Sequence, residues 1–97
     1  MSYSRVKELM NNISSEEFYK RIGKNVANFR KEKGLSQLEL SLEMNYKSIS
    51  IVSSAEICYK GKHFNLEHLL KISQILEVDI CNFFQKSQTN LNDEIKK

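Results

Sequence analysis

Apolar and polar residues follow one another along most of this chain with the period of amphipathic helices. Apolar residues recur three and four positions apart in residues 3–12, 16–33 and 37–44, and again after Asn65. The chain has no proline and only three glycines, so few positions force a turn. The pattern therefore predicts an all-α fold.

The longest predicted helix covers residues 16–33. Ser14 followed by Glu17 is a capping-box pattern, in which two side chains satisfy free backbone N–H groups at a helix start. Lysines in the last turn favour the negative end of the helix dipole, and Gly34 follows as a left-handed cap residue. One apolar stripe runs along the segment and comprises Phe18, Ile22, Val26 and Phe29.

A second capping box, Ser36 with Glu39, predicts a helix over residues 37–44. A short turn follows around Asn45, a residue type that tolerates the left-handed conformation. The core-facing residues of this helix would be Leu40, Met44 and the small Ser41, which allows another helix to approach closely.

Residues 48–58 are rich in serine and β-branched residues, which are weak helix formers. By propensity alone, this stretch fits a strand as well as a helix. Asn65 is a good N-cap for the next helix, whose wide apolar face consists of Leu66, Leu69, Leu70, Ile72, Ile75 and Leu76. Asp79 would cap a short last helix that contains Ile80, Phe83 and Phe84.

The length of the chain, 97 residues, fits one folded domain. We divide it into an N-terminal helical extension (1–15), a core domain (16–85) and a polar tail (86–97). The formal net charge is +3, and residues 1–34 carry eight lysines and arginines against four glutamates. Positive charge concentrated on the first third of the chain is compatible with a nucleic-acid partner.

The sequence offers little chemistry for catalysis or metal binding. It contains no glycine-rich phosphate loop and no Gly-x-Ser-x-Gly turn. Cys58 and Cys81 do not form a Cys-x-x-Cys pair, so we expect buried reduced thiols. His63 and His68 lack zinc-ligand spacing, so we expect neither metal nor cofactor. No stretch approaches the ~20 apolar residues of a membrane span, and no apolar signal core follows Met1, so we expect a cytoplasmic protein that is not an enzyme.

Several linked segments resemble one known family, the phage-repressor or Xre-like helix-turn-helix regulators. These segments are residues 22–24 (IGK), 29–41 (FRKEKGLSQLELS), 65–72 (NLEHLLKI) and 76–84 (LEVDICNFF). The resemblance implies a five-helix repressor-like domain, preceded here by an extra short N-terminal helix. It makes 48–58 the third helix, which enters the major groove of DNA.

The family's function is the second thing that the resemblance implies. We expect a sequence-specific transcriptional regulator, a repressor that binds a palindromic operator in double-stranded DNA as a homodimer. An antitoxin-type protein-binding module with autoregulatory DNA binding, or a restriction-modification controller protein, is the alternative. The sequence does not separate these uses of one fold.

Two registers, one residue apart, are open for the third helix. In the first, Ile51 takes the apolar position, and the groove-facing residues are Ser48, Ile49 and Ser53. In the second, Val52, Ala55 and Glu56 fit the family's apolar-apolar-glutamate spacing, and the groove-facing residues are Ile49, Ser50 and Ser54. We prefer the second, because it makes Glu56 the partner that the resemblance implies for Arg30. Neither register offers Arg, Asn or Gln to the base edges, so direct readout should be modest.

Further contacts are expected around the third helix. The family's glutamine at the start of helix two touches the DNA backbone, which gives that role to Gln37. The turn and loop that flank the third helix would add Lys47, Tyr59, Lys60 and Lys62, with packing into the core as the other possibility for Tyr59. The resemblance assigns the dimer interface to Ile80, Phe83 and Phe84.

Leu38 and Leu42 form an apolar pair on the outer face of helix two, where the family is usually polar. Such a pair needs a cover, either from a second subunit or from the N-terminal helix through Val6, Leu9 and Met10. We favour the N-terminal helix, because its own apolar stripe has no other obvious partner.

Overall fold

The computed structural model describes residues 13–86. The predicted helix over 3–12, its proposed cover of Leu38 and Leu42, and nearly all of the tail lie outside these residues. Within 13–86 the chain is helical and contains no strand, so the predicted all-α class is confirmed. The elements are α2 (Ser15–Glu32), α3 (Gln37–Glu43), α4 (Ser50–Ile57), the 3-10 helix η1 (Tyr59–Gly61), α5 (Leu66–Leu76) and the 3-10 helix η2 (Ile80–Phe84).

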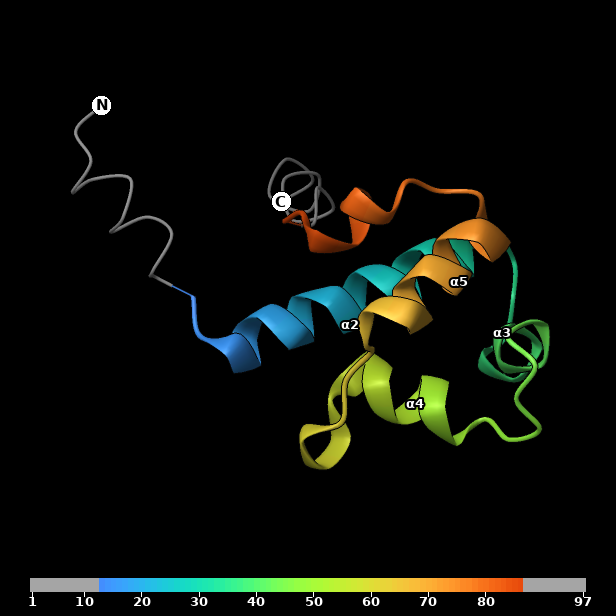
Figure 1. Cartoon of the computed structure of the whole chain (residues 1–97), viewed down its shortest axis with the longest axis horizontal. Helices are drawn as coiled ribbons and strands as arrows, with labels where there is room; N and C mark the ends of the chain where they lie inside the picture. Colours follow the sequence, from blue (N-terminus) through green and yellow to red (C-terminus); the bar gives the residue numbers. More distant parts are fainter. Residues whose placement is uncertain (1–12, 87–97) are drawn as a thin grey trace, which may run out of the picture.

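Helix α2 organises the fold and runs through the middle of the molecule (Figure 1). It contacts α4 on one side and η2 on another, while α3 packs against α4 and α5. One half of the predicted capping box is present: Ser14 Oγ accepts from the backbone N–H of Glu17 at 3.1 Å, whereas the return bond from the Ser14 backbone N–H to the Glu17 side chain is not formed. Gly34 adopts a φ of 81°, the left-handed conformation expected of the residue that ends the helix.

The second predicted capping box, at α3, has both of its hydrogen bonds. Ser36 Oγ accepts from the backbone N–H of Glu39 at 3.0 Å, and Glu39 Oε1 accepts from the backbone N–H of Ser36 at 2.8 Å. Leu40, Ser41 and Met44 are buried as predicted, and Asn45 has a φ of 70°. The start and the end of α3 are therefore set by residues close to it in the chain.

Residues 50–57 form helix α4, which decides the question that propensity left open. The helix starts two residues later than predicted, because Ser48 Oγ accepts from the backbone N–H of Ser50 at 3.1 Å and holds the preceding residues in a turn. It ends at Cys58, whose φ of 54° is left-handed. Val52 and Ala55 are buried in the core, so tertiary packing outweighs the weak local preference.

The packing of α2 against α4 depends on Gly23. A Cβ atom at this position would lie 2.5 Å from the backbone oxygen of Glu56 and 2.6 Å from that of Ala55. Such distances are far inside van der Waals contact, so only glycine lets the two helices approach this closely. We expected close approach at Ser41, and Gly23 is a second such position.

The predicted fifth α-helix is not formed as such. The segment forms the five-residue 3-10 helix η2, in which Asp79 Oδ1 accepts from the backbone N–H of Cys81 at 2.9 Å. The buried Asn25 holds η2 against α2, because its Nδ2 donates to the backbone oxygens of Phe83 at 2.9 Å and Gln85 at 2.6 Å. The segment is too short for an extended i to i−4 ladder, and Asn25 satisfies carbonyl groups that the end of η2 leaves free.

Candidate nucleic-acid interface

The predicted ion pair between Arg30 of α2 and Glu56 of α4 is present. Arg30 Nε donates to Glu56 Oε2 at 2.7 Å, and Arg30 Nη2 donates to Glu56 Oε1 at 3.1 Å. The side chains are 8% and 4% exposed, respectively. A bidentate pair in a buried setting fixes both distance and angle between the two helices.

Two further hydrogen bonds extend this pair to α3. Arg30 Nη1 donates to the backbone oxygen of Leu35 at 2.7 Å, and Gln37 Nε2 donates to Glu56 Oε1 at 2.8 Å. Gln37, predicted to contact the DNA backbone, is thus half-buried and bound to Glu56 in this structure. The network locks α2, α3 and α4 into one unit and has no counterpart in local sequence patterns.

The buried positions of α4 match the second predicted register. Val52, Ala55 and Glu56 are buried, whereas Ile51, the apolar anchor of the first register, is half-buried. Because successive residues of an α-helix are about 100° apart, the opposite face carries Ser50 and Ser54. Ser50 is exposed, whereas Ser54 and, at the edge of this face, Ser53 are half-buried.

Ile57 is a surface residue that the sequence analysis missed. It is 68% exposed, and it follows Ser53 and Ser54 by four and three positions, so it shares their face of α4. Sequence analysis missed Ile57 because an apolar residue in a helical segment is normally assigned to the core. The helical spacing from Ser50 was the available signal.

Ser48 and Ile49 lie before the first turn of α4. Ser48 Oγ donates to Ser50 Oγ at 3.0 Å, and both residues are exposed. Ile49 is 41% exposed and directly precedes the helix. Of the residues proposed for the two registers, Ser50 and Ser54 are therefore the ones that lie on the outward face of the helix itself.

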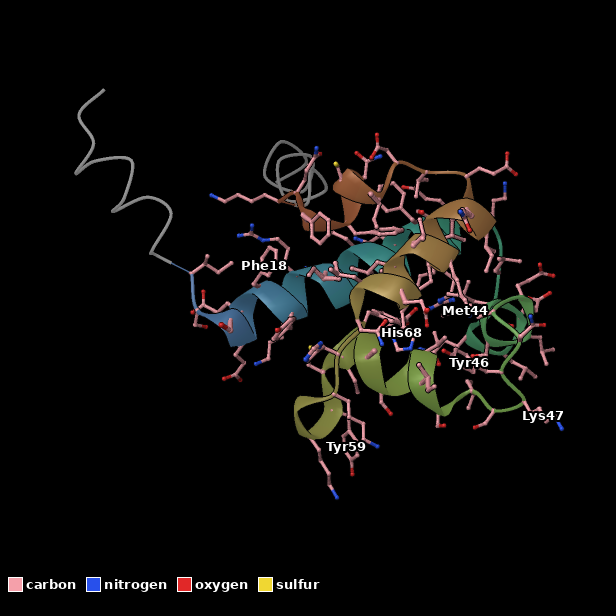
Figure 2. All side chains as sticks on the ribbon, viewed as in Figure 1. Phe18, Met44, Tyr46, Lys47, Tyr59 and His68 are labelled. Atoms are coloured by element: carbon pink, nitrogen blue, oxygen red, sulfur yellow. The ribbon has the colours of Figure 1, made fainter. Side chains whose placement is uncertain are left out.

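Positive charge lies at both ends of α4. Figure 2 shows Lys47 beyond the start of the helix and Tyr59 beyond its end. Lys47, Lys60 and Lys62 are exposed. Tyr59 is 52% exposed, so it does not pack into the core, and its ring lies 5.4 Å from Lys60 Nζ.

The prediction that Phe83 belongs to a dimer interface is wrong. Its side chain is fully buried in the core of the single chain and packs edge-on against Phe29, with ring centroids 5.9 Å apart. Ile80 and Phe84 remain half-buried at the surface. Two leucines of α5 that were expected in the core, Leu66 and Leu70, are instead 73% and 50% exposed.

Leu38 and Leu42 are 47% and 54% exposed, as their outward position in α3 predicts.

Cys58 and Cys81 do not meet the expectation of burial, because Cys58 is half-buried and Cys81 is exposed. Partial burial raises the pKa of the Cys58 thiol, and a hydrogen bond with Asp79 raises that of Cys81. A raised pKa makes formation of the reactive thiolate less favourable at both positions.

In residues 13–86, every helix is too short or too polar to cross a lipid bilayer. Comparison of the chain with models of known protein families and with curated proteins finds no match.

Proposed function

We propose that this chain is a DNA-binding transcriptional regulator of the repressor-like helix-turn-helix type. The observation that carries the proposal is the geometry of α3 and α4. A buried bidentate ion pair fixes α4 by its inner face, and its outer face presents hydroxyl groups between lysines at both ends. A helix that is held by its inner face and flanked by positive charge suits insertion of its outer face into a major groove.

The order of elements supports the same proposal. The α-helices α2, α3, α4 and α5 follow one another in the order that the resemblance implies for its first four helices, and the 3-10 helix η2 would take the place of the fifth. The N-terminal helix of the proposed architecture would precede α2. The fold alone does not define a function, so the proposal depends on the α4 surface.

Readout of bases would be limited. Ser50 and Ser54 can each contact several bases or a phosphate, and Ile57 can meet a thymine methyl group. Arg, Asn and Gln, which give the strongest base discrimination, do not occur in α4. We therefore propose that specificity depends on DNA shape and on the spacing of two half-sites.

A symmetric homodimer would supply that spacing, with half-sites about one helical turn (~34 Å) apart. The apolar residues available for such an interface are Ile80 and Phe84, at the surface of η2, and the exposed Leu66 and Leu70 of α5.

The second candidate function is an antitoxin-type module that also binds another protein. The exposed Leu38 and Leu42 on the outer face of α3 would be its apolar contact with that protein.

The decisive experiment selects duplexes from a random DNA pool with the full chain and measures the affinity of the enriched sequence. We expect enrichment of a two-fold symmetric site and weaker binding by Ser54→Ala. Ser15→Ala, an exposed serine at the start of α2, is the matched control. Failure to bind any duplex at about 50 mM salt, where phosphate contacts are strong, would exclude the proposal.

A further inference from the structure

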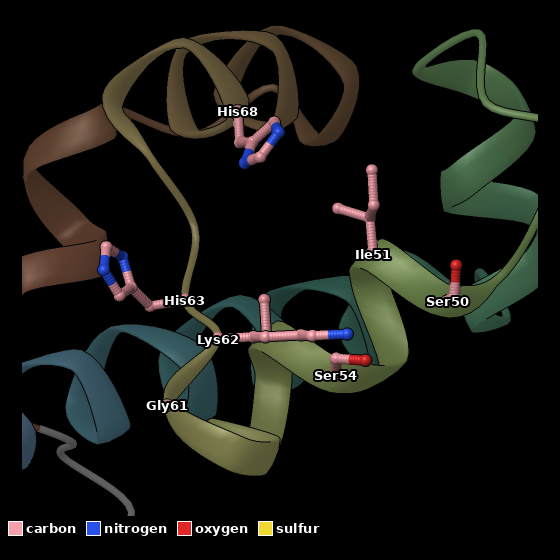
Figure 3. A pocket seen from close by; sticks show the side chains of 8 residues that line it. Ser50, Ile51, Ser54, Gly61, Lys62, His63 and His68 are labelled. Atoms are coloured by element: carbon pink, nitrogen blue, oxygen red, sulfur yellow. The ribbon is translucent and has the colours of Figure 1, made fainter.

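A recess opens between α4, the loop that precedes α5 and the first turn of α5 (Figure 3). Its volume is about 300 Å³, at the lower end of the range for small-molecule sites. Figure 3 shows Ile51 and His68 facing each other across it, while the Lys62 side chain extends along α4 toward Ser54. The polar side chains of the lining are Ser50, Ser54, Lys62, His63 and His68, Ile51 and Ala55 provide apolar surface, and Gly61 completes the wall.

His68 is fixed as a hydrogen-bond donor. Its Nδ1 accepts from the backbone N–H of Asn65 at 3.1 Å, and its own backbone N–H donates to Asn65 Oδ1 at 2.7 Å. Because Nδ1 accepts, the proton of the neutral imidazole lies on Nε2. Burial lowers the pKa of His68, which favours this neutral form. The capping box of α5 thus leaves a single N–H group to donate elsewhere.

The loop that carries Lys62 is also held in place. The ring of His63 stacks on Tyr19 of α2, with centroids 3.7 Å apart and planes 2° from parallel. Figure 3 shows His63 turned away from Ile51 and Ser54. The backbone N–H of Lys62 donates to the oxygen of Tyr59 at 3.1 Å. The backbone of Lys62 is therefore held beside the recess before any ligand binds, while its exposed side chain is free to reach a ligand.

We propose that this recess binds a small organic phosphate monoester. An ammonium group, an N–H group and two hydroxyl groups can donate to the oxygens of a phosphate, and none of the lining residues is acidic. The apolar surface of Ile51 and Ala55 would take the carbon part of the ligand. Where the proposed function holds, the bound ligand would cover Ser50 and Ser54 and compete with DNA.

The first test is a titration of the full chain with phenyl phosphate, without DNA, followed by amide NMR. We expect saturable one-site binding that moves the signals of Ser50, Ser54 and His68. Phenyl phosphate should bind at least about fivefold more tightly than inorganic phosphate, because its ring covers apolar surface. Shifts that do not saturate and spread over the lysines of the chain would overturn the proposal.

Matched variants locate the site. Lys62→Gln should weaken phenyl phosphate binding about tenfold, whereas Lys60→Gln, two residues away in the same loop and outside the recess, should change it less than about twofold. His68→Glu keeps a cap acceptor for Asn65 but adds a carboxylate, and it should abolish binding while circular dichroism stays unchanged. Equal effects of the two lysine variants would contradict the assignment.

Duplex binding separates this inference from the proposed function. Saturating phenyl phosphate should weaken duplex binding, and unchanged affinity would exclude competition. If phenyl phosphate saturates the recess but no duplex binds, the small-ligand site stands and the DNA proposal fails. If Lys62→Gln weakens duplex binding while phenyl phosphate never binds, these donors serve a DNA backbone phosphate, and the small-ligand site is excluded.

Discussion

Single residues connect helices that local sequence patterns treat as independent. Arg30 and Glu56 lie 26 positions apart, and their side chains are almost completely buried. A charge left alone in such a place would lose its hydration without gaining a partner. Removing one member of the pair should therefore cost more stability, through the unpaired charge that remains, than the attraction between the two charges contributes.

Replacing Glu56 tests the cost of leaving the Arg30 charge buried without its partner. Glu56→Ala should lower the free energy of unfolding by about 3–5 kcal/mol, because it leaves the Arg30 guanidinium buried and unpaired. Glu16, whose pair with Lys20 has side chains 76% and 59% exposed, is the control. Glu16→Ala should cost less than about 1 kcal/mol. Urea denaturation measures the unfolding free energy of both variants. Equal losses would contradict the larger contribution to stability that we assign to the buried pair.

Residue patterns predicted the local features of this fold better than the tertiary ones. Ser36 and Glu39 were recognisable because both partners of a capping box lie within four positions. Asn25 was not, since its two acceptors lie 58 and 60 positions away. Arg30 and Glu56 were paired in advance only through a family resemblance. The recess at His68 was also missed, because helices distant in the chain form it.

At the scale of elements, α3 and α4 are stabilised in opposite ways. Helix α3 has a complete capping box, whereas Ile49 at the start of α4 provides no side-chain cap. Helix α4 also consists mainly of serine and β-branched residues, so packing against α2 is what makes it helical. One helix is encoded locally and the other by its surroundings.

The cap of α3 predicts a dependence of stability on pH. Hydrogen bonds from the backbone N–H and the side chain of Ser36 lower the pKa of Glu39 in the folded chain. The stabilisation is therefore complete above the unfolded-state pKa of glutamate, about 4.3, and is lost as the pH falls through the lower folded-state value. Glu39→Gln should be less stable than the native chain at pH 7, and the difference should shrink toward pH 3.

Unfolding by urea at several pH values measures this difference. Glu43→Gln, an exposed carboxylate at the end of the same helix, controls for the loss of one charge. If the stabilities of the native chain and of Glu39→Gln fall in parallel between pH 7 and pH 3, the ionised Glu39 side chain does not contribute to the stability of the cap.

The contact between α2 and α4 gives a prediction that opposes helix propensity. Alanine is favoured over glycine by about 1 kcal/mol inside a helix. Gly23→Ala should nevertheless lower stability by about 1–3 kcal/mol, because the added methyl group meets backbone oxygens of α4 that cannot move independently. Lys24→Ala, the exposed neighbour in the same helix, should have little effect in thermal unfolding. A more stable Gly23→Ala variant would mean that the helices can separate freely.

The whole molecule places its chemically different surfaces on different elements. Lysines flank α4, while the exposed leucine pairs lie on α3 and α5. A long-range positive field depends on salt, whereas apolar contacts do not share that dependence. The two kinds of surface can therefore be tested separately in solution.

Salt dependence tests the lysine surface. Log affinity for duplex DNA should fall linearly with log salt, and Lys47→Gln should lower the slope by about 0.9 if it removes one phosphate contact. Lys71→Gln, an exposed lysine of α5, should leave the slope nearly unchanged. Titrations at several salt concentrations measure this, and an affinity indifferent to salt would place the lysines away from DNA.

The leucine surfaces test the assembly. Sedimentation equilibrium at micromolar concentration should show a dimer, and Leu70→Ser should weaken it by at least about tenfold, because burying a leucine contributes about 1.5–3 kcal/mol. Leu38→Ser, a similarly exposed leucine on α3, serves as the comparison. If Leu38→Ser dissociates the dimer and Leu70→Ser does not, the interface lies on α3.

The dependence of α4 on its surroundings has a genetic consequence. Helix α4 has weak propensity, and its N-cap residue Ile49 makes no side-chain bond. It should therefore unfold together with the core that holds it, in one step on heating. Mild defects anywhere in that core, away from Ser50 and Ser54, should then give conditional alleles. Such alleles would be functional in cells grown cool and null in cells grown warm, and screens for temperature-sensitive mutants should find them mainly at buried positions.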